Sequence, residues 1–395
     1  MRGGISIKLM AFEWESFSQM DLELSLVEYG IELGRFMYQF DILQEDEYFV
    51  RHFSRILKEG EYQGVISWNF WPLVAEVCFR LEIPYIAWVY DCPIAYDIVK
   101  WAKYPTSFIF IFDRVEYEKY KLLGVPHVYH HQLAVNIKRL EGLNLNDNDI
   151  EKYESEVSFL GSMYDSLYEN LADTFTPYEK GYMDAVIRSQ QSIYGMSVVE
   201  KSFHNEYLAN IKTHLEADGV IESCGQDEFD EWFFRFVLRC VSRKDRIMLL
   251  SRLGKQFRTK YFSYREYPEI DYAQYSGPLL YDEAMFKMFK ASKINLNITS
   301  RQITSGISLR ALDIMGAGGF LLSNWQEELM ENFTPGVDFV YYDSIEDALE
   351  KCRYYIEHED ERRTIARNGH NAVRKFEYQV QIKRIMDLVF GKQAG

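Results

Sequence analysis

Short apolar segments alternate with amphipathic segments along the first 140 residues of the chain. The segments "ISIKLMAF", "GVISW", "YIAWVYD" and "SFIFIFD" are typical of strands, and helical spacing of apolar residues follows them. Parallel strands need a crossover connection, which is usually a helix, so this alternation indicates βαβ units and a parallel sheet. The sequence therefore predicts a Rossmann-like domain over residues 1–140.

The chain of 395 residues is too long for one core, and the alternation resumes after a polar interval. Residues 141–156 are polar and charged, as in a linker, and "VSFLGSMYD" then begins a second domain expected over residues 157–375. Residues 166–250 are helical in pattern and rich in aromatic side chains, which predicts a helical insertion. Residues 376–395 predict a final helix. The expected fold class is α/β with two Rossmann-like domains.

The segment "SQMD" predicts how the first helix begins. Ser18 has the N-cap position and Asp21 the third position of a capping box, in which each side chain bonds the other residue's backbone N–H group. The helix is expected to run to Gly30.

The charge balance argues against a nucleic-acid partner. The chain has 60 acidic and 44 basic residues, a net charge of −16, and lacks the cationic surface that nucleic acid or anionic lipid favours. A local basic patch and peripheral membrane contact stay open. No apolar run reaches the roughly 18 residues that span a bilayer, because charges interrupt the most apolar region: Asp91, Asp97, Lys100 and Lys103.

Cysteine usage indicates a reducing compartment. The five cysteines are scattered and include no C-x-x-C pair. No N-terminal run resembles the apolar region of a secretory signal. We therefore expect a cytoplasmic protein.

Acidic and amide residues follow the predicted strands of the first domain. In open α/β sheets, ligands bind outside the carboxyl ends of the strands. Side chains at these positions therefore face any ligand, and they are Glu13 and Glu15 after the first strand, Asn69, Asp91 and Asp113.

The segment "SGISLRALDIMGAGGFLLSN" carries a cation and an anion one turn apart on a short helix between two strands. Ser305 and Gly306 are expected to introduce this helix, so that its free N–H groups form an anion site. Arg310 and Asp313 share the face of Gly306 at helical spacing. The arrangement suits a nucleoside diphosphate, with Arg310 and the N–H groups on the phosphates and Asp313 on the ribose hydroxyls. The alternative is a surface ion pair worth roughly a few tenths of a kcal/mol, with glycines that serve only a tight turn.

The same segment, extended to "SGISLRALDIMGAGGFLLSNWQEEL", resembles the donor-binding segment of the CgeB-like (spore-maturation type) glycosyltransferases, within the group 1 glycosyltransferases of GT-B fold. The resemblance covers nearly the whole chain. It implies two Rossmann-like domains facing across a cleft, a nucleotide-sugar donor on the second domain and an acceptor mainly on the first. It further implies a role in bacterial glycosylation and a final helix that crosses back to the first domain. On this basis Glu13, Glu15 and Asn69 are expected on the acceptor side.

Two features depart from the pattern of related retaining enzymes. Asp313 matches the second acid of their Glu-x7-Glu pattern, but Ser305 stands where the first acid would be. The Arg/Lys pair that many GT-B enzymes place after the first strand of the second domain is absent from "GSMYDS". Phosphate charge is then expected to be met by Arg310, helped by Arg301, and by the helix end.

Two other clusters carry metal-type residues. Asp147 and Asp149 form a D-x-D triplet, but they follow a polar linker, which favours a turn or helix cap over a metal site. His127, His130 and His131 have no cysteine or clustered carboxylate to complete a ligand set, so packing or cleft lining is favoured. We expect no metal and no cofactor.

Asp91 is the candidate catalytic residue. It ends a strand beside Cys92 and Pro93, and the resemblance implies a carboxylate at this position. It can deprotonate an acceptor hydroxyl if the enzyme inverts, and a helix cap or loop anchor is an equal alternative.

The expected function is transfer of a sugar from a nucleoside-diphosphate sugar, with UDP favoured, to a hydroxyl of a glycan or protein acceptor without a metal. The alternatives are a nucleotide-sugar epimerase of the same architecture and a non-catalytic sugar- or nucleotide-binding module. The sugar, the acceptor, the stereochemical outcome and the oligomeric state are left open by the sequence.

Overall fold

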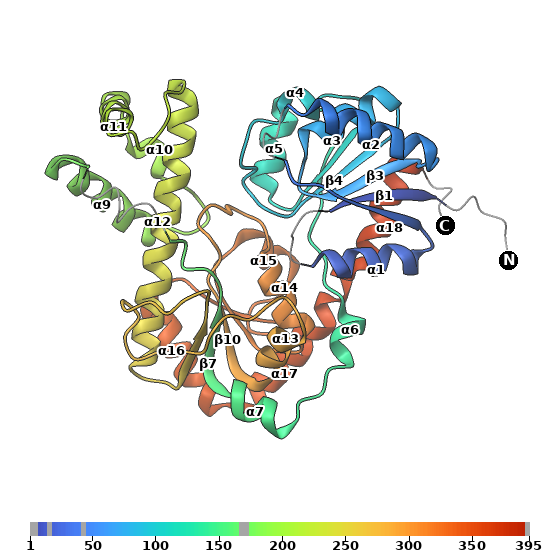
Figure 1. Cartoon of the computed structure of the whole chain (residues 1–395). Helices are drawn as coiled ribbons and strands as arrows, with labels where there is room; N and C mark the ends of the chain where they lie inside the picture. The colour runs from blue at the N-terminus through green and yellow to red at the C-terminus, as the bar shows by residue number, and fades with distance from the viewer. Residues whose placement is uncertain (1–6, 14–17, 41–44, 166–173, 392–395) are drawn as a thin grey trace. The chain divides into compact units, whose positions relative to one another are not determined.

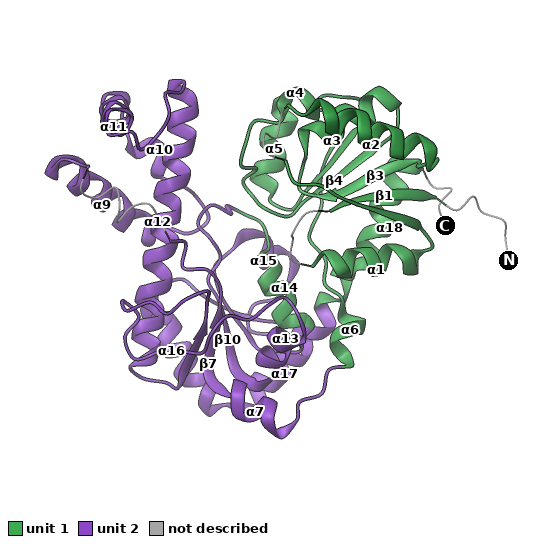
Figure 2. Ribbon diagram, viewed as in Figure 1, with its two compact units in different colours: residues 1–142, 305–316, 373–395 green, residues 143–304, 317–372 purple. Residues whose placement is uncertain are grey.

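The computed structural model describes residues 7–13, 18–40, 45–165 and 174–391. The chain divides into two compact units, which Figure 2 shows in different colours. Unit 1 comprises residues 1–142, 305–316 and 373–395, and unit 2 comprises residues 143–304 and 317–372. Residues 305–316, which the sequence places within the second domain, thus group with unit 1 by their contacts.

Unit 1 contains a parallel six-stranded sheet in the order β2-β1-β3-β4-β5-β6. Helices α1 to α5 connect successive strands, and Figure 1 shows α2 and α3 on one face of the sheet and α1 and α18 on the other. The Rossmann-like expectation is confirmed. The strands are β1 (Lys8–Glu13), β2 (Glu32–Met37), β3 (Gly64–Trp68), β4 (Tyr85–Val89), β5 (Ser107–Ile111) and β6 (Val128–His130). The helices are α1 (Gln19–Tyr29), α2 (Glu47–Glu59), α3 (Pro72–Leu81), α4 (Val99–Ala102), α5 (Arg114–Leu122), α6 (Ile137–Glu141), α14 (Leu309–Gly316), the 3-10 turn η1 (Val373–Phe376) and α18 (Tyr378–Phe390).

Strand β2 has no counterpart among the strands expected from sequence. It lies at the edge of the sheet against β1, and none of its residues is buried. An edge strand that faces solvent lacks the continuous apolar run by which a buried parallel strand is recognised.

Helix α1 has the expected bounds, but the expected capping box is wrong. Ser18 has a left-handed backbone with φ of 60°, and its side chain makes no capping hydrogen bond. An N-cap side chain normally reaches the helix N–H groups from an extended backbone, which Ser18 does not have. Asp21 instead pairs with Arg139 of α6 at 2.6 Å and accepts a 3.0 Å hydrogen bond from Asn136.

The core of unit 1 supports the ends of its strands. Helix α2 buries Phe49, Val50, Phe53 and Leu57 along one face, as expected for an amphipathic helix. Phe12 of β1 packs edge-on against Phe49 and Phe53, with ring centroids 5.9 Å and 6.0 Å apart. Rigid packing of this kind fixes the positions of the polar residues that follow the strands.

Unit 2 contains a second parallel sheet in the order β12-β11-β10-β7-β8-β9. The chain runs outward from β7 through β8 to β9 and then returns to β10 on the other side of β7. The strand order therefore reverses between β7 and β10, and this switch point is where ligands of open α/β sheets bind. The strands are β7 (Ser155–Leu160), β8 (Thr259–Phe262), β9 (Gln274–Tyr275), β10 (Ser292–Asn297), β11 (Leu321–Asn324) and β12 (Val340–Tyr342).

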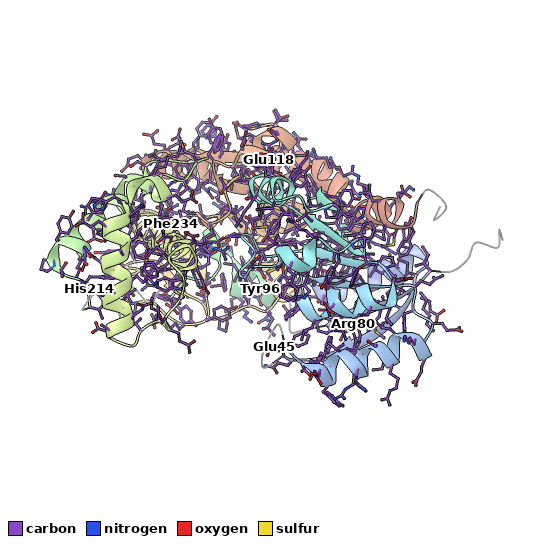
Figure 3. The ribbon with its side chains drawn as sticks, turned by 90° about the horizontal axis from the view of Figure 1, so that it is seen from above. Glu45, Arg80, Tyr96, Glu118, His214 and Phe234 are labelled. Atoms are coloured by element: carbon purple, nitrogen blue, oxygen red, sulfur yellow. The ribbon has the colours of Figure 1, made fainter. Side chains whose placement is uncertain are left out.

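The helices of unit 2 include the expected aromatic insertion between β7 and β8. Figure 1 shows its long helix α12 running from the small helical group to the sheet, and Figure 3 labels Phe234 and His214 within that group. His214 Nδ1 lies 3.1 Å from Glu179 Oε1, which connects α11 with α9. The insertion helices are α9 (Pro177–Gln191), α10 (Val199–Ser202), α11 (Asn205–Ala217) and α12 (Gln226–Gly254), and the others are α7 (Asp147–Tyr153), α13 (Glu283–Ala291), α15 (Glu327–Asn332), α16 (Ile345–Glu357) and α17 (Glu359–Ala372).

The interval expected as a linker, residues 141–156, is largely structured, because it contains α7 and the start of β7. Asn146 and Asp149 form a capping box at the start of α7. Asp149 also lies 3.2 Å from Lys287 Nζ, so the D-x-D triplet serves as the helix cap that its context favours. Across the described ranges, no helix is both long and apolar enough to cross a membrane.

Candidate active site

Asn69 and Asp91 meet at the carboxyl ends of the adjacent strands β3 and β4. Asn69 has a left-handed backbone with φ of 57°, a conformation that asparagine tolerates better than most residues. Its Oδ1 accepts hydrogen bonds from the N–H groups of Tyr90 at 2.8 Å and Asp91 at 3.0 Å. Its Nδ2 donates to Asp91 Oδ2 at 2.8 Å. Asn69 therefore holds both the backbone and the carboxylate of Asp91.

The Asp91 carboxylate is reachable and more basic than usual. Its residue is exposed, yet the surrounding protein removes enough water to raise the pKa above its ordinary value, while the hydrogen bond from Asn69 lowers it. Tyr96 (Figure 3), in the loop that follows Asp91, donates from its hydroxyl to the carbonyl of Phe70, which ties this loop to the segment before α3. An exposed and positioned carboxylate with a raised pKa is suited to accept a proton.

Glu13, the last residue of β1, forms a second acidic group in unit 1 with Glu23 of α1. Arg35 of β2 lies between them, with Nε 3.6 Å from Glu13 Oε1 and Nη2 2.7 Å from Glu23 Oε2. Burial and then the neighbouring Glu23 raise the pKa of Glu13 to about 7, and Arg35 opposes the rise. Glu15, the other acid expected here, lies outside the described residues.

Ser305 and Gly306 precede α14 and do not begin it, because that helix starts at Leu309. Their N–H groups donate to Asp113 Oδ2 at 3.1 Å and 3.2 Å. The Ser305 hydroxyl donates to Asp113 Oδ1 at 3.2 Å, and the residue is 1% exposed. The carboxylate thus occupies the two N–H groups expected to hold a phosphate.

Glycine at position 306 has a packing reason. A Cβ atom there would lie 2.8 Å from Phe112 Cδ2 and 3.0 Å from the Asp113 backbone. Close packing against Phe112 and Asp113 therefore accounts for a glycine at this position.

Arg310 and Asp313 form the expected i, i+3 pair on α14, but the pair is not a surface one. Arg310 Nη1 lies 3.7 Å from Asp313 Oδ2, and the Asp313 side chain is 1% exposed. Burial raises the pKa of Tyr90, the negative charge of Asp313 raises it further, and Arg310 lowers it. The pair therefore lies within electrostatic range of Tyr90, at the end of β4.

Arg301 is occupied as an anchor within unit 2. Its Nε lies 2.7 Å from Asp245 Oδ2 on α12, and its Nη1 and Nη2 donate to the carbonyls of Ile193 and Gln191 at 3.0 Å and 3.1 Å. The guanidinium also lies 3.8 Å from the centre of the Tyr194 ring. All three nitrogens hold protein groups, so this geometry fastens the end of α9 to α12.

The histidines pack within unit 1. His127 stacks on Phe108 with centroids 4.6 Å apart, and His131 contacts Trp88 and Phe110 edge-on. Burial lowers the pKa of His131 to about 3, so its ring is neutral at physiological pH. The described residues contain no cluster of three or more groups that could hold a metal ion.

Helix α12 brings cations to the sheet of unit 2 that the sequence pattern did not reveal. Arg243 and Arg246 lie near the carboxyl end of β7, beside Asp165 and Ser162 respectively. They are about 80 residues downstream of that strand, and no local motif marks them. Their position follows from the packing of α12 against the sheet.

Comparisons with known proteins agree with this architecture. Residues 235–387 match the family model described as glycosyl transferase-like. Sucrose-phosphate synthase from Thermosynechococcus elongatus is similar in structure with a TM-score of 0.57 and 9% identity, covering 97% of this chain and 99% of that one. HepE of Anabaena, in complex with UDP and glucose, has a TM-score of 0.52 and 11% identity, covering 96% and 98%. A glycosyltransferase from Rickettsia africae has a TM-score of 0.52 and 9% identity, covering 97% and 98%.

The fold of the chain is GT-B. At identities this low, the structural likeness shows the fold alone, and a search of curated proteins found no sequence match. The glycosyl transferase-like match over residues 235–387 supports the enzyme class. The chain is a glycosyltransferase of GT-B fold, as expected, and the CgeB-like subgroup stays a prediction.

Proposed function

We propose that the protein transfers a sugar from a UDP-sugar to an acceptor hydroxyl with inversion and without a metal. The observation that carries the proposal is the Asp91 carboxylate, which Asn69 holds at the carboxyl ends of β3 and β4. Two hydrogen bonds fix its backbone and side chain, and its raised pKa makes it a stronger base than an ordinary aspartate.

Asp91 acts as the general base in this proposal. Its carboxylate accepts the proton of the acceptor hydroxyl as that oxygen attacks the anomeric carbon of the donor sugar. The bond from this carbon to the diphosphate breaks, and the nucleoside diphosphate leaves with the bonding electrons. A single displacement inverts the anomeric carbon, which agrees with the serine at position 305 in place of the first acid of the retaining pattern.

The donor assignment has support from related structures and from α14. HepE, which shares the fold, has been solved with UDP and with UDP-glucose. In this chain Arg310 is the partner proposed for the diphosphate and Asp313 for the ribose. For Ser305 and Gly306 to bind phosphate as well, the phosphate must displace the Asp113 carboxylate from their N–H groups.

Metal independence is proposed from the role of the D-x-D triplet. Asp149 already caps α7 and pairs with Lys287, so its carboxylate has structural partners. Positive charge near the phosphates is then left to arginine side chains.

The test is acceptor-dependent release of UDP. The full chain is incubated with UDP-glucose, UDP-galactose or UDP-N-acetylglucosamine and panels of glycan and peptide acceptors, with and without EDTA. We expect release of UDP only with an acceptor, unchanged by EDTA and strongly reduced in Asp91→Asn. Asp97→Asn is the matched control, because this nearby carboxylate caps Val99 and does not contact Asn69.

Other outcomes separate the alternatives. Conversion of the donor without an acceptor would indicate the epimerase, and binding of UDP-sugars without turnover would indicate a binding module. Full activity of Asp91→Asn would contradict the role of Asp91, and activity that EDTA abolishes and Mg²⁺ restores would contradict metal independence.

A further inference from the structure

Arg246 lies at the switch point of the unit 2 sheet. From α12 its side chain reaches the carbonyl of Ser162, just after β7, and the carbonyl of Ile298, directly after β10, at 2.5 Å for the latter. These are the two strands between which the strand order reverses. Arg246 therefore occupies the position in the sheet where open α/β folds bind their ligands.

The charge of Arg246 has no directly paired carboxylate among the described residues, although the negative charge of the neighbouring Asp245 lies within electrostatic range. The residue is 6% exposed, and the described part of the chain offers no carboxylate oxygen within ion-pair distance of its guanidinium. Asp245, the preceding residue, pairs with Arg301 at 2.7 Å. A buried cation among neutral groups is costly, so an anion is the partner that would offset this cost.

Arg243, one turn earlier on α12, shows the contrast. It is 5% exposed, and its guanidinium lies 2.6 Å from Glu269 and 3.4 Å from Asp165. Two carboxylates thus pair directly with Arg243, whereas no described carboxylate pairs directly with Arg246, although the two side chains share a helix and are similarly buried.

The guanidinium of Arg246 has unused hydrogen-bond donors. Its Nη1 and Nη2 donate to Ser162, Ile298 and, at 3.3 Å, the hydroxyl of Tyr164, whereas its buried Nε has no acceptor among the described residues. An arginine offers five N–H groups, and these three acceptors leave part of the fork for another ligand. Position 161 is glycine, and a Cβ there would lie 3.3 Å from Nη1.

From these observations we infer that Arg246 binds the diphosphate of the nucleotide donor. The inference rests on the proposed function and names the cation that takes the place of the Arg/Lys pair missing after β7. A planar arginine fork matches phosphate oxygens and makes charge-assisted hydrogen bonds with them. Because the guanidinium is buried, the phosphate reaches it only if the segment Ser162–Asp165 moves.

The test compares UDP and uridine binding by calorimetric titration in wild type, Arg246→Met and Arg243→Met. Methionine keeps the apolar stem and removes the charge in both variants. We expect Arg246→Met to bind UDP about tenfold to hundredfold more weakly, the range for hydrogen bonds to charged groups, and to bind uridine as wild type does. Arg243→Met should keep wild-type affinity for UDP. Circular dichroism verifies that each variant is folded.

A folded Arg246→Met variant with wild-type affinity for UDP would overturn the inference and show that Arg246 only ties two loops together. If that variant does not fold, hydrogen exchange of the wild-type chain decides. UDP, but not uridine, should then change exchange in peptides that cover residues 161–165 and 298–301, and unchanged exchange would overturn the inference. Wild type that binds UDP but transfers no sugar would refute the proposed function alone, and wild type that does not bind UDP would refute both.

Discussion

Glu13→Gln should make the protein less sensitive to pH between 5 and 8. The Glu13 side chain is 15% exposed, lies near the Glu23 carboxyl and faces the Arg35 guanidinium at 3.6 Å. Burial and Glu23 raise its pKa to about 7, against an ordinary value of 4.5. Between these values the folded state binds more protons than the unfolded state, so stability falls as the pH rises through this window.

The pKa difference sets the magnitude. At roughly 1.4 kcal/mol per pKa unit, it corresponds to about 3 kcal/mol of lost stability well above pH 7. About 2 to 3 kcal/mol of this loss develops between pH 5 and pH 8. Glutamine keeps the shape and the ability to hydrogen bond Glu23 and cannot ionise, so Glu13→Gln should be more stable than wild type at pH 8.

The assay is urea denaturation at pH 5, 6, 7 and 8, followed by circular dichroism and tryptophan fluorescence. The stability advantage of Glu13→Gln over wild type should grow by about 2 to 3 kcal/mol from pH 5 to pH 8. Glu32→Gln is the control, since Glu32 on β2 is 61% exposed and pairs with Lys8 at 3.1 Å. When Glu32→Gln is added to Glu13→Gln, the pH-dependent stability advantage of Glu13→Gln should remain. Parallel wild-type and Glu13→Gln curves across this pH range would refute the reasoning.

Four further outcomes are expected. Asp91→Asn should gain stability relative to wild type as the pH rises above the ordinary aspartate range, since the raised pKa makes the ionised form costly in the folded state, and pH-dependent denaturation checks this. Gly306→Ala should lose about 1 to 3 kcal/mol of stability because the added Cβ would lie 2.8 Å from Phe112. An unchanged melting temperature would contradict this prediction. Arg301→Met should lose about 3 to 5 kcal/mol of stability because it leaves Asp245 buried without its paired cation. A stable Arg301→Met variant that binds UDP weakly would instead indicate that Arg301 belongs to the donor site. Arg310→Ala should weaken the binding of UDP by about 1.5 to 3 kcal/mol and the binding of uridine much less, which calorimetric titration of both ligands would measure.

The sequence alone was sufficient for the two-sheet α/β architecture, although it missed the edge strand β2. Buried parallel strands such as "GVISW" and "SFIFIFD" are continuous apolar runs because both faces of the sheet are covered, and their spacing by helices implies parallel sheets. The aromatic insertion was recognisable for the same reason, since its helices must bury their own core. The carboxyl ends of the strands then marked Glu13, Asn69 and Asp91, because in this fold a strand end is also the ligand side of the sheet.

Only the tertiary structure decided which of these groups interact. The N–H groups of Ser305 and Gly306 hold Asp113, and the guanidinium of Arg301 holds Asp245, although sequence reasoning directed all three residues to the donor. Arg246 reaches Ser162, just after β7, from 84 residues away. A local pattern specifies backbone conformation and the buried face, because both depend on near neighbours in the chain. The partner of a charged or polar group depends on which distant segments packing brings within about 3 Å, and no local pattern contains that distance.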